Sequence, residues 1–274
     1  MICKICDVNE IDKPDGICID CNIKFDEKMK RIWKAIYEDE INIFDNETCN
    51  SCRKDIQIRA KMSHPVPLPY VGKDFFQDEN NILFAGIESY GGLELKEKQN
   101  PKYDPFTLNR MNELYFELDK DKKGRRKYYP FWRWVRTISE EIIGKEDDSF
   151  HSIAYSNLLK CQARTYNLDD NEWECFESLC ENCIKEIRWI HEEIKYLNPK
   201  NVVIFSGIGF DYYLAEMLLD GVRPIDIIDK ENKITSRKLL FTDFIQGDQR
   251  YIITNHPRYS NQIIKERIID ILSN

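Results

Sequence analysis

Cysteine is the residue whose spacing most clearly indicates chemistry in this chain. Eight of its ten cysteines form four C-x-x-C pairs, which are Cys3/Cys6, Cys18/Cys21, Cys49/Cys52 and Cys180/Cys183. Two intervening residues let both thiolates turn toward one ion, and soft sulfur ligands select zinc or iron–sulfur clusters. The start of the chain lacks the features of a secretory signal, so we expect a reducing compartment in which these pairs bind metal.

The first two pairs predict one zinc site. A Pro-Asp-Gly turn separates the pairs, as a short zinc ribbon requires, and four thiolates complete a closed tetrahedral site: Cys3, Cys6, Cys18 and Cys21. Two roles fit this zinc. It can hold together a segment too small to fold alone, or it can contact DNA directly.

Three other polar residues, Glu88, Asn157 and His256, stand at the ends of apolar runs. A carboxylate can orient water or stabilise a cation, and a carboxamide presents a donor and an acceptor together. An imidazole can stabilise developing negative charge. Together these groups are suited to recognising a planar base and activating water.

The segments that carry these residues predict an α/β fold. Four continuous apolar runs fit strands buried on both faces: 80–89, 152–160, 201–207 and 250–257. Amphipathic stretches fit helices: 130–143, 171–197, 210–219 and 260–272. We expect a three-layer αβα domain with a mostly parallel, four-stranded central sheet, to which 238–245 adds an edge strand. Ligands bind at the carboxyl ends of such strands, so the three polar residues should converge on one crevice.

Three motifs, in the order of these strands, resemble the uracil-DNA glycosylase superfamily over roughly residues 49–265. "GIESY" (86–90) looks like the water-activating motif, with Glu88 at its third position. "NLLKC" (157–161) is similar to the N-x-x-K-C segment of the iron–sulfur (family 4-like) branch, and "HPRYS" (256–260) is similar to the H-P-S motif. The resemblance implies that Asn157 reads the base, that His256 supports its departure and that Glu88 positions water.

The resemblance further implies the domain organisation and a second metal group. Residues 1–48 would be a zinc-ribbon segment with a helix, and 49–274 a glycosylase-like domain. A [4Fe–4S] cluster would be held by Cys49, Cys52, Cys161 and Cys180. An alternative stays open, in which Cys49/Cys52 and Cys180/Cys183 hold a second zinc and Cys161 is a buried thiol.

The motifs also depart from the family pattern. Ser89 stands where the motif has proline, and Arg258 stands where it has serine. Tyr90 occupies the place where some branches have a tyrosine that excludes the methyl group of thymine. The resemblance implies uracil as the target, in base-excision repair. The departures are compatible with another modified pyrimidine instead, in defence against phage with altered bases.

One dense basic and aromatic stretch, 119–136, has the composition of a DNA groove, in which cations meet phosphates and rings stack on bases. A solvated loop leading into a core helix is the alternative. We predict that Lys123, Arg125, Arg126 and Arg258 contact DNA. Candidates for stacking on the base are Tyr90, Phe106, Tyr129 and Phe131.

Composition sets the outer limits. With 274 residues, 42% of them hydrophobic, the chain can bury a core, and its net charge of -8 argues against a simple polycation. No apolar run approaches the roughly 20 residues that span a bilayer. We expect a cytoplasmic monomer with no membrane partner and no nucleotide cofactor, acting on single- or double-stranded DNA. The predicted function is a monofunctional DNA glycosylase; the alternative is a non-catalytic, zinc-dependent nucleic-acid-binding module.

Overall fold

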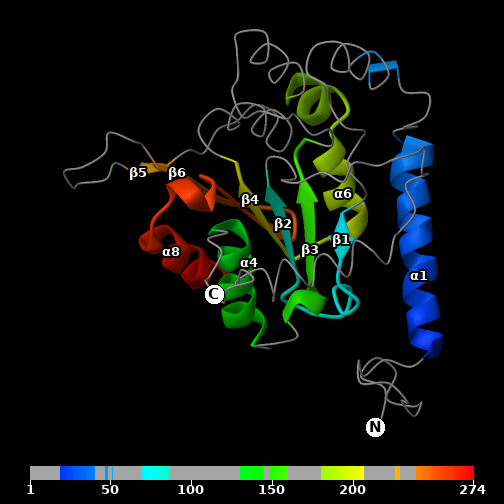
Figure 1. Cartoon of the computed structure of the whole chain (residues 1–274), viewed down its shortest axis with the longest axis horizontal. Coiled ribbons are helices and arrows are strands. Elements are labelled where there is room, and N and C mark those ends of the chain that lie inside the picture. Colours follow the sequence, from blue (N-terminus) through cyan, green and yellow to red (C-terminus); the bar gives the residue numbers. More distant parts are fainter. Residues whose placement is uncertain are drawn as a thin grey trace, which may run out of the picture.

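The computed structural model describes residues 19–40, 47–48, 51, 69–86, 130–144, 149–159, 180–206, 226–228 and 239–274. These residues form one mixed sheet in the strand order β1-β3-β2-β4-β7-β6-β5, with helices on both faces (Figure 1). The predicted α/β class is confirmed.

The sheet is larger than the four strands that the sequence predicts. Its strands are β1 (Tyr70–Val71), β2 (Ile82–Gly86), β3 (Ile153–Asn157), β4 (Asn201–Phe205), β5 (Asp226–Ile228), β6 (Leu239–Gln246) and β7 (Gln249–Thr254). Neighbours β3, β2, β4 and β7 run parallel, whereas β1 pairs antiparallel with β3 at one edge. At the other edge β6 pairs antiparallel with both β7 and β5, so the expected edge strand is not the outermost one.

A tight turn explains why β6 and β7 pair as a hairpin. Only Gly247 and Asp248 separate the two strands, and Gly247 has a φ of 60°. Glycine adopts this left-handed conformation without steric cost, which two-residue hairpin turns exploit.

The helical segments are α1 (Ile19–Trp33), η1 (Lys34–Glu40), α4 (Pro130–Ile143), η3 (Ser149–Ser152), η4 (Glu181–Glu186), α6 (Trp189–Leu197), η5 (Pro257–Tyr259) and α8 (Gln262–Leu272). Helix α4 spans the predicted range. The helix predicted over 171–197 is interrupted, because η4 and α6 are separated at Ile187 and Arg188, and Arg188 has a φ of 59°. Neither glycine nor proline stands at Ile187 or Arg188, so the sequence has no helix-breaking residue that would predict this interruption.

Two buried clusters, one on each face of the sheet, make up the core of the described residues. Within β2, Leu83 and Ala85 face the side covered by α1 and α6, whereas Ile82 and Phe84 face the side covered by α4 and α8. This alternation follows from the two-residue period of a strand. Continuous apolar runs such as β2 are therefore buried on both faces.

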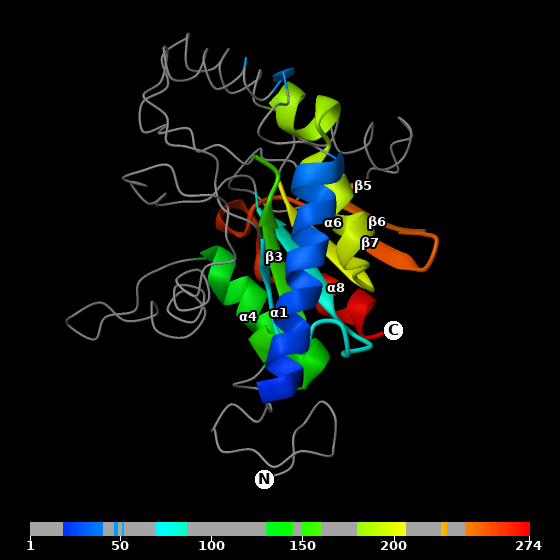
Figure 2. The ribbon, with the colours of Figure 1, turned by 90° about the vertical axis from the view of Figure 1, so that its right-hand side faces the viewer.

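Helix α1 packs against the sheet (Figure 2). Its residues Met29, Ile32 and Trp33, with Ile36 of η1, belong to the same buried cluster as Leu83 of β2. The described part of the N-terminal segment thus contributes directly to the α/β core. Among the predicted zinc ligands, Cys21 lies in the first turn of α1, and Cys3, Cys6 and Cys18 lie outside the described residues. In the ranges that the structure describes, no helix has the length and apolar character needed to cross a membrane.

Candidate active site

The carboxyl ends of the parallel strands are level with one another. Gly86, the last residue of β2, pairs with Asn157 of β3 on one side and with Phe205 of β4 on the other. Phe205 in turn pairs with Thr254, which lies two residues before His256. This register aligns the carboxyl ends of four strands along one side of the sheet, where open α/β sheets bind ligands.

Six residues meet at this edge on the α4 face and are called the strand-end cluster: Gly86, Phe131, Tyr155, Asn157, Phe205 and His256. The Phe131 ring is central to the cluster. Its centroid lies 5.4 Å from that of Tyr155, 5.5 Å from that of Phe205 and 6.0 Å from that of His256. The planes of Phe131 and His256 differ by only 23°. Asn157 joins the cluster through Tyr155, whose hydroxyl donates to Asn157 Oδ1.

The start of helix α4 positions Phe131. Pro130 is the first helical residue, and proline suits this position because its fixed φ matches the helix and its missing N–H is not needed there. The next turn buries Trp134 and Val135 against the sheet. Phe131, one turn before Val135, is thereby carried to the strand ends and is half-buried there.

Asn157 is only 5% exposed, and its side chain has a defined orientation. Tyr155 Oη lies 2.5 Å from Asn157 Oδ1. Elsewhere in the described residues nothing hydrogen-bonds to Asn157 Nδ2, so the amide nitrogen is available as a donor.

His256 is half-buried, and its Nδ1 accepts a hydrogen bond of 3.2 Å from the backbone N–H of Arg258. Burial, and then the positive charge of Arg258, lower the pKa of His256 from 6.5 to about 4. The imidazole is therefore neutral at physiological pH. Because Nδ1 accepts, the single ring proton is on Nε2, which makes Nε2 a hydrogen-bond donor.

Gly86 is closely packed at the centre of the cluster. A Cβ atom at this position would lie 3.3 Å from Phe131 Cε2, 3.5 Å from Tyr155 Oη and 3.6 Å from Asn157 Oδ1. A side chain here would therefore crowd the phenylalanine ring, and glycine permits this close approach.

Arg258 and Tyr259, in η5, border the cluster on the protein surface. Arg258 is exposed and its guanidinium carbon lies 6.0 Å from the centre of the Tyr259 ring. Tyr259 is 50% exposed, and its ring centroid lies 6.3 Å from that of His256. A charged group and an aromatic ring thus face solvent beside the imidazole.

The structure brings together Asn157, Phe131, His256 and Arg258 from the set of predicted site residues. Cys180 and Cys183 also lie among the described residues, away from this cluster. Leaving aside the N-terminal zinc ligands, the other predicted site residues lie outside the described residues: Glu88, Tyr90, Phe106, Tyr129, Lys123, Arg125, Arg126, Cys49, Cys52 and Cys161. Three cluster members, Gly86, Tyr155 and Phe205, were not assigned a role there by sequence reasoning. Tyr155 has a signal that could have found it, because residues two apart in a strand share a face.

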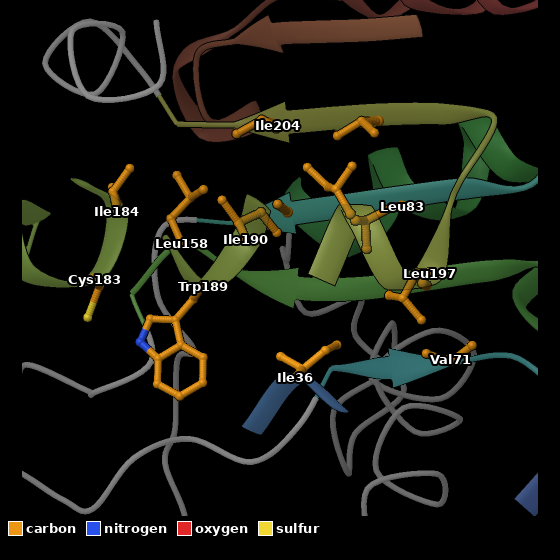
Figure 3. Close-up of a cluster of buried hydrophobic side chains, with 14 of the residues drawn as sticks. Ile36, Val71, Leu83, Leu158, Cys183, Ile184, Trp189, Ile190, Leu197 and Ile204 are labelled. Atoms are coloured by element: carbon orange, nitrogen blue, oxygen red, sulfur yellow. The ribbon is translucent and has the colours of Figure 1, made fainter. Parts of the chain in front are cut away.

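Cys180 and Cys183 are both buried, at the start of η4 and within it. They belong to the buried hydrophobic cluster on the face covered by α1 and α6. Figure 3 shows Cys183 at the end of this hydrophobic cluster where Leu158 and Trp189 also lie. Buried thiols three residues apart fit a soft-metal site in part. Within the described residues, no group of three or more His, Cys, Asp or Glu side chains could hold a metal ion. Any further ligands would have to come from other parts of the chain.

Comparison with known proteins found no matching family model and no matching curated protein.

Proposed function

We propose that the protein is a DNA glycosylase that hydrolyses the N-glycosidic bond of uracil or another modified pyrimidine and leaves an abasic site. One observation carries the proposal. A buried amide whose Nδ2 has no hydrogen-bond partner among the described residues, Asn157, and a neutral imidazole, His256, flank one aromatic ring at the carboxyl ends of parallel strands.

Recognition begins with a nucleotide flipped out of the base stack, at a cost of a few kcal/mol. Phe131 is the stacking candidate that this cluster supports, because its half-buried ring lies beside both polar groups. Asn157 Nδ2 donates to an oxygen on the edge of the base. Gly86, which lacks a side chain, lets the Phe131 ring and the Asn157 amide lie close to the end of β2.

Bond cleavage places negative charge on the base and positive charge on the sugar. His256 stabilises the negative charge, because its Nε2–H can donate to the oxygen of the departing base. A neutral imidazole can perform this task because Nδ1 accepts from the Arg258 N–H and the ring proton therefore stays on Nε2. The half-buried position strengthens the interaction by limiting competition from water.

In this proposal Glu88 acts on the positive charge of the sugar. It follows Gly86 by two residues, and a carboxylate there would stabilise the cationic sugar and orient water. The bond between C1′ and the base nitrogen breaks and its electron pair leaves with the base. Water adds to C1′, and its released proton neutralises the base or passes to solvent.

DNA is the proposed partner, in single- or double-stranded form. Arg258, exposed beside His256, would contact a phosphate next to the flipped nucleotide. Lys123, Arg125 and Arg126 would contact further phosphates. Repair of damaged bases and defence against phage with modified DNA are both consistent with this activity.

The metal groups in this proposal are structural. Cys3, Cys6, Cys18 and Cys21 would hold zinc, whereas Cys49, Cys52, Cys161 and Cys180 would hold a [4Fe–4S] cluster. Cys183 would replace Cys161 as a ligand if the second group is zinc. Burial of Cys180 and Cys183 on the face opposite the strand-end cluster supports a cross-linking role, away from the hydrolysed bond.

Release of free bases tests the proposal. Wild-type protein is incubated with genomic and phage DNAs that carry different modifications, and mass spectrometry identifies the released bases. Glu88→Gln and His256→Ala should abolish release while DNA binding persists. His191→Ala, on α6 at the other face of the sheet, is the matched control and should remain active. DNA binding without any base release by the wild type would favour a non-catalytic binding module instead.

A further inference from the structure

Tyr155 is a partly buried residue of the strand-end cluster whose hydroxyl the proposed reaction does not yet use. It precedes Asn157 by two residues in β3, so both side chains lie on the α4 face of the sheet. The only hydrogen bond of its hydroxyl within the described residues is the one donated to Asn157 Oδ1. Among the described residues, the Tyr155 hydroxyl thus bonds to the Asn157 amide alone.

The surrounding rings hold the Tyr155 phenol in place. Its ring centroid lies 4.8 Å from that of Trp132 and 5.4 Å from that of Phe131. Burial raises the pKa of Tyr155 above its ordinary value of 10.0, and the hydrogen bond to Asn157 opposes this rise to a smaller extent. The hydroxyl therefore keeps its proton over the whole physiological range and remains able to donate.

The Tyr155 hydroxyl restricts the orientation of the Asn157 amide, because its proton needs an acceptor. A carboxamide has two flip states, which exchange the positions of oxygen and nitrogen. In the observed state the Tyr155 proton has an acceptor. In the flipped state Nδ2 would donate to Tyr155 Oη, and the buried hydroxyl proton would lose its acceptor among the described residues. Leaving a buried donor unsatisfied disfavours the flipped state by roughly ten- to a hundredfold.

We propose that Tyr155 is a positioning residue that holds the Asn157 amide in one flip state, with Oδ1 bound to the tyrosine and Nδ2 offered to the ligand. The consequence for substrate choice rests on the proposed function. A base with a carbonyl oxygen opposite Nδ2 is accepted. A base with an amino group there meets donor against donor and is rejected.

The test compares Tyr155→Phe with Tyr70→Phe in the full-length protein. Tyr70 is a suitable control because it pairs with Tyr155 in the sheet and its buried hydroxyl donates to a different acceptor, Phe150 O, at 3.1 Å. Single-turnover release is measured from matched oligonucleotides that carry uracil or cytosine. Tyr155→Phe should lower the uracil-to-cytosine ratio by about tenfold, whereas Tyr70→Phe should leave the ratio unchanged. An unchanged ratio in Tyr155→Phe would overturn the inference and leave the glycosylase proposal intact.

A second measurement does not depend on catalysis. Side-chain amide NMR signals of Asn157, assigned by their loss in Asn157→Asp, should form one pair in the wild type and in Tyr70→Phe. Tyr155→Phe should give a second pair or exchange broadening, because both flip states become populated. One sharp, unshifted pair in Tyr155→Phe would refute the positioning role even if no base were released by the wild type. Absence of base release would count against the proposed function alone.

Discussion

His256 should stay neutral to a much lower pH than an ordinary histidine. Burial and, to a lesser extent, Arg258 lower its pKa from 6.5 to about 4. This difference corresponds to about 3 kcal/mol in favour of the neutral imidazole, and it is an upper value because the ring is only half-buried. The proposed donor, Nε2–H, should thus act unchanged through the physiological range and be perturbed only as the pH approaches 4.

The same difference predicts how stability depends on pH. An unfolded histidine binds a proton near its ordinary pKa of 6.5, whereas folded His256 does so only near 4. Between these values the unfolded state holds more protons, so the free energy of unfolding falls as the pH is lowered. Urea denaturation should show this fall in the wild type, by at most about 3 kcal/mol beyond the change in His256→Gln.

NMR titration of the histidines, with His256 assigned by its loss in His256→Gln, measures the pKa directly. This step is needed because a carboxylate such as Glu88 ordinarily titrates at about 4.3 and would also shape the activity profile. Arg258→Gln should raise the His256 pKa, yet keep it below 6.5 because burial is the larger cause. A wild-type value near 6.5, or an equal pH dependence of unfolding in wild type and His256→Gln, would refute the assignment.

Three further predictions concern the cluster and the metal. Phe131→Leu should lower kcat/KM for base release by roughly 10- to 100-fold, because base–aromatic stacking contributes about 1–3 kcal/mol; an unchanged value would exclude this ring as the stacking platform. Gly86→Ala should also reduce release, because its methyl group would lie 3.3 Å from Phe131 Cε2 and displace the ring, and a fully active variant would show that the position of this ring is not required. Cys161→Ser should remove iron and absorbance at about 400 nm while Cys183→Ser keeps both; the reverse pattern, with zinc bound to the wild type, would support a second zinc.

The parts of the fold that sequence reasoning reached are those with local patterns. The runs over 82–86, 153–157 and 201–205 are continuous and apolar because the strands are buried on both faces, and such runs are visible in sequence. Because these strands are parallel, their carboxyl ends lie on the same side of the sheet, which places Asn157 and His256 together. Helix α4 shows the same principle, because Pro130 and the apolar periodicity mark its start and its buried face.

Other features depend on contacts between distant segments and leave no local pattern. Strands β1 and β5 are two and three residues long, too short to show a period, and exist because longer neighbours pair with them. Phe131 could not be chosen among the candidate rings because the choice depends on how α4 lies over β3 and β4. The cause is tertiary packing, which overrides what a short window of sequence can specify.

Strand β3 links the two faces of the sheet at its carboxyl end. Tyr155 and Asn157 point to the α4 face, and Ser156 between them points to the α6 face, where its hydroxyl donates to the fully buried Glu193 carboxylate. Cys180 and Cys183 pack on this second face, next to α6. If Cys180 binds the proposed metal, its loss should disturb η4, α6 and, through Glu193 and Ser156, the strand that presents Asn157. A structural metal could in this way be required for base release without contacting the base, which is why iron content and selectivity should be measured on the same variants.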